Sequence, residues 1–236
     1  MSLVTTFLSH SRIESYPPNI YEYPNFYKCK EHVFILYPGD VLYIPPNWFH
    51  WVFSYNNTDN TNKAISFPIL NHNILSKTSN PDILSKKPFI YHVNINTINF
   101  DILNNEYVHI FKSKNHNIYP FNKTLKTDII KSNIIYSNIN DLINKKKHNF
   151  VCNAYMNLNL IKPPEFLNYI LDKNKEQLQY KSLLFNTYSR NDTPINTGLH
   201  YDYWHNFLVQ IDGIKVVRLY HPNCHKNLYV HPVVFL

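Results

Sequence analysis

The stretch HYDYWHNFLVQIDGIKVVRLY (200–220) combines polar and apolar residues in a pattern that decides the fold. Two apolar runs flank Asp212 and Gly213, and this dipeptide predicts a two-residue type I′ turn between paired antiparallel strands. In that register Gln210 faces Lys215 across the hairpin. Because both faces of the strands carry apolar residues, the lysine either is buried beside an anionic partner or reaches solvent at a barrel rim.

The start of the same stretch offers metal ligands. His200 and Asp202 are two residues apart, so on extended backbone their side chains point to the same side and can converge on one ion. Two histidines and one carboxylate that leave open positions suit a non-haem Fe(II) oxygenase. His50 is the candidate for the second histidine, and the alternative is an ordinary core histidine between Trp48 and Trp51.

The sequence has only three glycines, Gly39, Gly198 and Gly213, and all fall in the stretches that carry these polar residues, where turns demand glycine.

The rest of the chain predicts mostly short strands. The polar segment 71–87 suits a linker, and residues 163–178 and about 138–146 predict helices. Strands are predicted at 32–37, 41–45, 51–55, 63–70, 87–95 and 179–188.

Composition narrows the class of protein. The chain has 236 residues, 44% hydrophobic and 17% charged, which is typical of a folded protein. No apolar run approaches the ~20 residues of a membrane span, and the first residues lack the features of a signal peptide. We therefore expect a soluble intracellular protein with no membrane partner.

The net charge of +7 weakly favours anionic partners. Three scattered cysteines indicate neither disulfides nor zinc.

Two blocks of the sequence together amount to a family resemblance. TGLHYDYWHNFLVQIDGIKVVRLYHP (197–222) resembles the first iron-binding block of the JmjC family of Fe(II)/2-oxoglutarate dioxygenases. YPNFYKCKEHVFILYPGDVLYIPPNWFHWV (23–52) resembles the second block of that family. Both are most similar to the branch that contains the asparaginyl hydroxylase of hypoxia-inducible factor. The resemblance implies a mainly β fold with helices, a double-stranded β-helix or jelly roll of the cupin type.

The resemblance also implies roles for individual residues. His200, Asp202 and His50 would be the ligands of Fe(II), and 2-oxoglutarate would be the co-substrate. Lys215 would bind the distal carboxylate of 2-oxoglutarate and so supply the anionic partner. The further residues at positions where the family contacts the co-substrate are Thr197, Asn206, Tyr155 and Ser66.

The order of the two blocks departs from the family, in which the HxD block precedes the distal histidine. Segment 1–70 resembles the C-terminal half of a barrel, and 88–236 resembles the N-terminal half, with 71–87 as the linker. This order suggests a circular permutation in which both halves form one barrel. Two alternatives stay open: two chains exchange halves in a homodimer, or the chain is a gene relic that cannot assemble the site.

The function that follows is an Fe(II)- and 2-oxoglutarate-dependent dioxygenase acting on a protein side chain, by hydroxylation or demethylation. One alternative is a catalytically inactive cupin that binds a protein or RNA partner through its basic surface. Another is a metal-dependent cupin of a different kind, such as an isomerase, which the abundance of histidines keeps open. The sequence does not name the substrate.

Overall fold

The structure is a computed structural model that describes residues 9–55, 61–69, 83, 85–94, 107–112, 134–138, 150–156, 181–187 and 195–231; between 107 and 187 it describes only the backbone of the strands. The elements are η1 (Pro24–Lys28), β1 (Glu31–Leu36), β2 (Asp40–Ile44), β3 (Phe49–Tyr55), β4 (Thr61–Ile69), β5 (Phe89–His92), β6 (Tyr107–Lys112), β7 (Ile134–Asn138), β8 (Phe150–Met156), β9 (Lys181–Thr187), β10 (Ile195–Asn196), β11 (His200–Tyr201), β12 (His205–Asp212), β13 (Ile214–Tyr220) and η5 (Pro222–Asn227).

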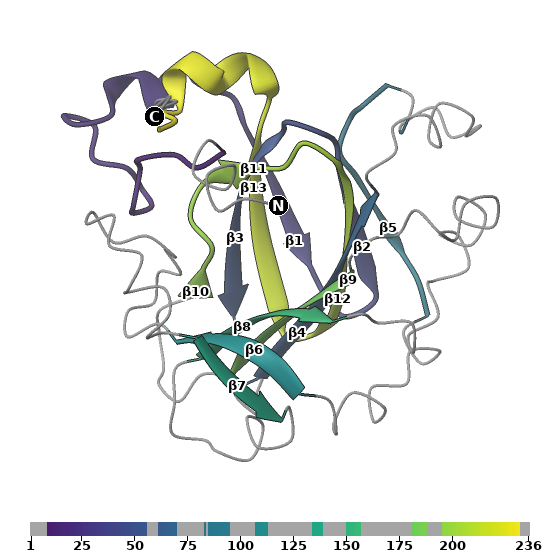
Figure 1. Ribbon diagram of the computed structural model, residues 1–236. Helices are drawn as coiled ribbons and strands as arrows, with labels where there is room; N and C mark the ends of the chain where they lie inside the picture. Colours follow the sequence, from purple (N-terminus) through teal and green to yellow (C-terminus); the bar gives the residue numbers. More distant parts are fainter. Residues whose placement is uncertain are drawn as a thin grey trace.

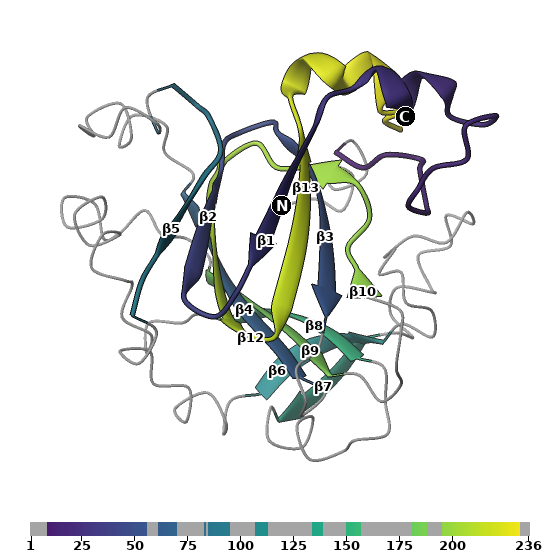
Figure 2. The ribbon, with the colours of Figure 1, turned by 180° about the vertical axis from the view of Figure 1, so that it is seen from behind.

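The strands form two antiparallel sheets that face each other (Figures 1 and 2). One sheet, here called sheet A, has the order β1-β13-β3-β10, with β11 also beside β3. The other, sheet C, has the order β5-β2-β12-β4-β9-β8-β6-β7. In sheet A, strands from before residue 70 alternate with strands from residue 195 onward, and in sheet C the late strand β12 lies between the early strands β2 and β4. The expected mainly β jelly roll is confirmed.

The predicted hairpin at Asp212-Gly213 is wrong. Gly213 does make a tight turn, with φ of +74°, but β12 and β13 enter opposite sheets. β12 pairs with β2 and β4, whereas β13 pairs with β1 and β3, so Gln210 and Lys215 are not cross-strand partners. The period-2 pattern fixes which face of a strand is buried but does not fix which strand becomes its neighbour.

The alternation of side chains places one face of each strand inside the barrel. Val52 of β3 and Val217 of β13 belong to the same buried cluster as Leu42 and Leu208 from the opposite sheet. Lys215 lies on this inner face, because it alternates with Val217 along β13. Alternation along a strand therefore determines which side chains share a face, whichever strands are its neighbours.

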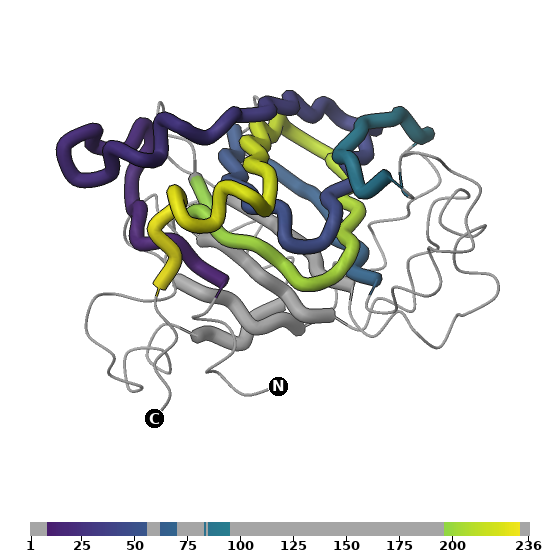
Figure 3. The backbone as a smooth tube through the Cα atoms, turned by 90° about the horizontal axis from the view of Figure 1, so that it is seen from above, coloured from purple at the N-terminus to yellow at the C-terminus, as the bar shows by residue number. Residues whose placement is uncertain are grey.

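The outer face of sheet A is covered by segments from both ends of the described chain. Trp51 and Tyr220 pack in one buried cluster with Ile13 and Phe26 from the N-terminal segment and Leu228 from the C-terminal segment. In Figure 3 these two segments, purple and yellow, run along the same side of the molecule. The cluster ties both segments to the back of β3.

All six strands predicted outside residues 200–220 are observed. Among the described residues no helix is long and apolar enough to cross a lipid bilayer. The helix predicted at 163–178, most of the helix predicted near 138–146 and most of the linker 71–87 lie outside the described residues. The observed counterparts of the six predicted strands are β1, β2, β3, β4, β5 and β9.

Candidate metal centre

β3 and β11 bring the three candidate metal ligands together. His50 and His200 are direct cross-strand partners in this antiparallel pair, and their ring centroids are 4.1 Å apart. Asp202 follows two residues after His200, and its Oδ2 lies 3.8 Å from Nε2 of His50. Among the described residues, these three form the group of histidine, cysteine and acidic side chains close enough to share one metal ion, with ligand atoms within 4.8 Å of one another.

Backbone carbonyls orient both imidazoles in the same way. Nδ1 of His50 lies 3.1 Å from the carbonyl oxygen of Trp48, and Nδ1 of His200 lies 3.0 Å from that of Gly198. A carbonyl only accepts, so each Nδ1 carries the proton and donates it. Nε2 of each neutral ring therefore keeps its lone pair for a cation, which is the arrangement of metal-binding histidines.

The electrostatics of the site also favour neutral imidazoles. Burial lowers the pKa of both His50 and His200 to about 4, so both rings are uncharged at neutral pH. Burial raises the pKa of Asp202, and the nearby histidines and a side-chain hydrogen bond from Asn206 oppose that rise. Two neutral nitrogen donors and one carboxylate are the donor set of the non-haem Fe(II) facial triad. The residues present fit such a metal ion.

Lys215 lies on the same inner face, opposite Ser54 of β3. Its side chain is 1% exposed, and its Nζ donates a hydrogen bond of 2.6 Å to Oγ of Ser54. Burial lowers its pKa to about 7. Among the described residues no carboxylate forms an ion pair with this ammonium group. A buried cation with one acceptor fits a site for an anionic group of a ligand.

The structure places only some of the other predicted co-substrate residues near the candidate ligands. Asn206 and Ser66 meet on the inner face of sheet C, where Oγ of Ser66 donates to Oδ1 of Asn206 at 2.6 Å. Since Asn206 also bonds Asp202, both belong to the surroundings of the candidate ligands. Thr197 is half-buried, and its hydroxyl donates a long hydrogen bond of 3.4 Å to the adjacent Gly198 carbonyl.

Tyr155 is on β8, and its side chain lies outside the described part of the structure. Its predicted contact with the co-substrate stays a prediction.

Two residues beside the site were missed from the sequence. Ser54 is four residues after His50 on β3, so strand alternation alone could have placed it on the inner face. His10 stacks on His200, with ring centroids 5.0 Å apart and an interplanar angle of 10°. No local pattern around His10 signals this contact, because it depends on a tertiary pairing with a segment far along the chain.

Comparisons with known proteins agree with the fold. The chain belongs to the cupin-like domain family, whose model matches residues 4–70 and 131–235. This JmjC-type family includes Fe(II)/2-oxoglutarate oxygenases.

A similar protein occurs in Acanthamoeba polyphaga mimivirus and is named a JmjC domain-containing protein. It is 26% identical over 231 residues, an alignment that covers 89% of this chain and 37% of the viral protein. The chain thus spans little more than a third of the relative that it matches. No solved structure matches the chain.

Proposed function

We propose that this chain forms an Fe(II)- and 2-oxoglutarate-dependent dioxygenase domain that hydroxylates a side chain of a protein substrate. The observation that carries the proposal is the convergence of His50, His200 and Asp202 on the inner face that also buries the ammonium group of Lys215. Ser54 accepts a hydrogen bond from this group, and no carboxylate in the described part of the chain forms an ion pair with it. Several kinds of cupin hold a metal ion with such a triad, but a buried cation on the same inner face fits a co-substrate with two carboxylates.

Each group of this chain would have a defined task. The imidazoles and the carboxylate would hold Fe(II), which together with 2-oxoglutarate and O2 supplies the oxidation of an unactivated C–H bond. Lys215 would bind the distal carboxylate of 2-oxoglutarate. Asn206 would hold the Asp202 carboxylate in place through its amide, and the apolar residues around Val52 and Leu208 would exclude water from the pocket.

The finer assignments belong to the same proposal. Hydroxylation is preferred to demethylation because both sequence blocks are most similar to the asparaginyl hydroxylase branch. A protein is preferred to RNA as the substrate for the same reason.

Segments 1–70 and 88–236, joined by 71–87, would make one permuted barrel within a single chain. The direct pairing of β3 with β11 and β13 supports that arrangement.

The test is 2-oxoglutarate turnover with purified protein. Wild-type protein with Fe(II), ascorbate and O2 is expected to convert 2-oxoglutarate to succinate, and His200→Ala is expected to abolish this conversion. His92→Ala is the matched control, because this histidine lies on β5 and bonds Asp40, not the site. Unchanged turnover in His200→Ala would refute the proposal. A wild-type protein that binds neither Fe(II) nor 2-oxoglutarate would instead indicate a binding protein.

A further inference from the structure

A short segment around His10 pairs with the backbone that carries a candidate ligand. The amide of Ser11 donates to the carbonyl of Leu199 at 2.8 Å, and the amide of Tyr201 donates to the carbonyl of Ser9 at 3.0 Å. These bonds flank the residue between Leu199 and Tyr201, which is the first candidate ligand of the HxD pair. The N-terminal segment therefore fixes the backbone on which this ligand stands.

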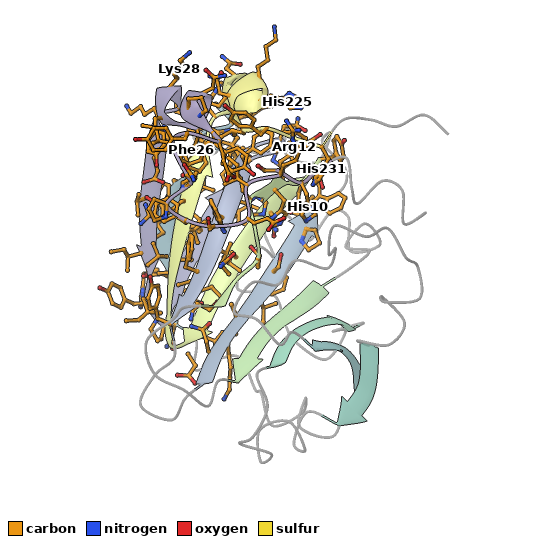
Figure 4. The ribbon with its side chains drawn as sticks, turned by 90° about the vertical axis from the view of Figure 1, so that its left-hand side faces the viewer. His10, Arg12, Phe26, Lys28, His225 and His231 are labelled. Carbon is orange, nitrogen blue, oxygen red and sulfur yellow. The ribbon has the colours of Figure 1, made fainter. Side chains whose placement is uncertain are left out.

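The other edge of the same segment pairs with the C-terminal part of the chain. The amide of His231 donates to the carbonyl of His10 at 3.0 Å, and the amide of Arg12 donates to the carbonyl of Tyr229 at 2.9 Å. Figure 4 shows His10, Arg12 and His231 grouped at this end of the barrel. Because the segment is hydrogen-bonded on both edges, its backbone is held in place beside the HxD pair.

The imidazole of His10 points to the metal centre. It is 8% exposed and lies nearly parallel to the ring of His200, at 5.0 Å between centroids. Its charge acts on both His50 and Asp202 when it is protonated. Yet its ring nitrogens are not part of the ligand group. His10 therefore contacts a candidate ligand without being one.

We infer that His10 is a positioning residue of the metal centre, which holds the ring of His200 in the orientation that metal binding needs. This inference rests on the proposed function. His200 stands on a two-residue strand, and one hydrogen bond to Gly198 orients its ring. The single hydrogen bond leaves some rotation about the Cβ–Cγ bond of His200. A planar neighbour packed on the ring face restricts this rotation further. Neighbours that orient metal ligands through hydrogen bonds typically change metal affinity about 10- to 100-fold, and we expect packing on the ring face to have an effect at the lower end of that range.

Metal affinity tests the inference without any turnover. Co2+ binding is measured by its visible absorption and by competition with a chromophoric chelator, for wild type, His10→Ala and His10→Phe. We expect His10→Ala to bind Co2+ at least about tenfold more weakly. His10→Phe keeps a flat ring against His200 and is expected to stay within about threefold of wild type, because stacking needs no ring nitrogen. His92→Ala controls for the loss of one histidine elsewhere.

The outcomes separate this inference from the proposed function. If wild type binds no Co2+, the metal centre itself is refuted. If wild type binds Co2+ and folded His10→Ala binds it equally well, or if His10→Phe loses as much affinity as His10→Ala, the positioning role is refuted and the metal centre stands. Should His10→Ala fail to fold, as judged by circular dichroism, His10→Asn replaces it, because asparagine keeps a polar group beside Ser9 and has no ring.

Discussion

Lys215 shows how a single residue links the stability of the protein to its function. The chain buries an ammonium group on the inner face of β13, where Val217 and Leu219 occupy the equivalent positions. Ser54 provides one acceptor, whereas an ammonium group can donate three hydrogen bonds. A core that served stability alone would place an apolar side chain there. The lysine therefore destabilises the protein without its ligand.

We expect Lys215→Met to stabilise the protein and to abolish 2-oxoglutarate binding. The gain in unfolding free energy at pH 7 should be on the order of 1–4 kcal/mol, because a buried cation is replaced by an apolar chain of similar length. Urea unfolding followed by tryptophan fluorescence gives the first quantity, and isothermal titration calorimetry gives the second.

The pH dependence provides the control for this variant. Since burial lowers the pKa of Lys215 to about 7, against an ordinary value near 10.5, the unfolded chain binds more protons between these two values. The unfolding free energy of wild type should therefore rise relative to Lys215→Met as the pH rises from about 7 to 10. An equal or lower stability of Lys215→Met at pH 7 would contradict the burial penalty.

Much of the site at the residue scale follows from the sequence. The HxD spacing predicts that His200 and Asp202 point to the same side, and the family resemblance added His50 and Lys215 to the site. Ser54 could have been found by strand alternation. His10 could not, because its contact depends on backbone pairing between segments almost 190 residues apart, which no local pattern encodes.

At the scale of elements, the tight turns connect the two sheets. The turn at Tyr37–Asp40 takes the chain from β1 in sheet A to β2 in sheet C, and the turn at Gly213 does the same between β12 and β13. The Asp212-Gly213 dipeptide correctly predicted a sharp reversal of the chain. It was insufficient to distinguish a reversal within a sheet from a crossing between sheets, because that choice depends on the strands contributed by the other half of the chain.

Gly39→Ala should therefore destabilise the barrel. Gly39 has φ of +96°, a region that costs a residue with a side chain about 1–3 kcal/mol. A Cβ there would also overlap the ring of His92. We expect a loss of about 2–4 kcal/mol in chemical unfolding, the strain plus the displacement of that ring.

The double variant with His92→Ala separates the two causes. Adding Gly39→Ala to His92→Ala should cost only the backbone strain, about 1 kcal/mol or more, because no ring is left for the new Cβ to overlap. A Gly39→Ala variant as stable as wild type would show that this turn does not require glycine.

At the scale of the whole molecule, the two ends of the chain depend on each other. Every strand of sheet A from before residue 70 pairs with a strand from after residue 195. One chain thus supplies both candidate histidines. We expect that His50→Ala and His200→Ala, unfolded together and refolded as a mixture, recover no high-affinity Co2+ site. Chains that exchange halves in a dimer would instead restore about a quarter of the sites.

A circular permutant tests the proposed order of the halves. The carbonyl of His10 accepts a hydrogen bond from the amide of His231, so a flexible linker can join the segments that precede and follow these two residues. With new termini placed within 71–87, the rearranged chain should fold and keep its Co2+ affinity within about threefold, because permutation preserves a domain whose ends are adjacent. An insoluble or metal-free product, beside a wild type that binds Co2+, would contradict the proposal.

The same interleaving has a consequence for how fast the protein folds. Ser54 and Lys215, which share a hydrogen bond in the core, are 161 residues apart in the chain. Closing a loop of this size costs chain entropy before the core offers any compensation, and proteins dominated by such distant pairings fold in milliseconds to seconds or more slowly. During synthesis β3 leaves the ribosome long before β13. The apolar residues of β3 therefore stay exposed until β13 has been synthesised. We expect the yield of soluble protein to depend on chaperones and on low expression temperature.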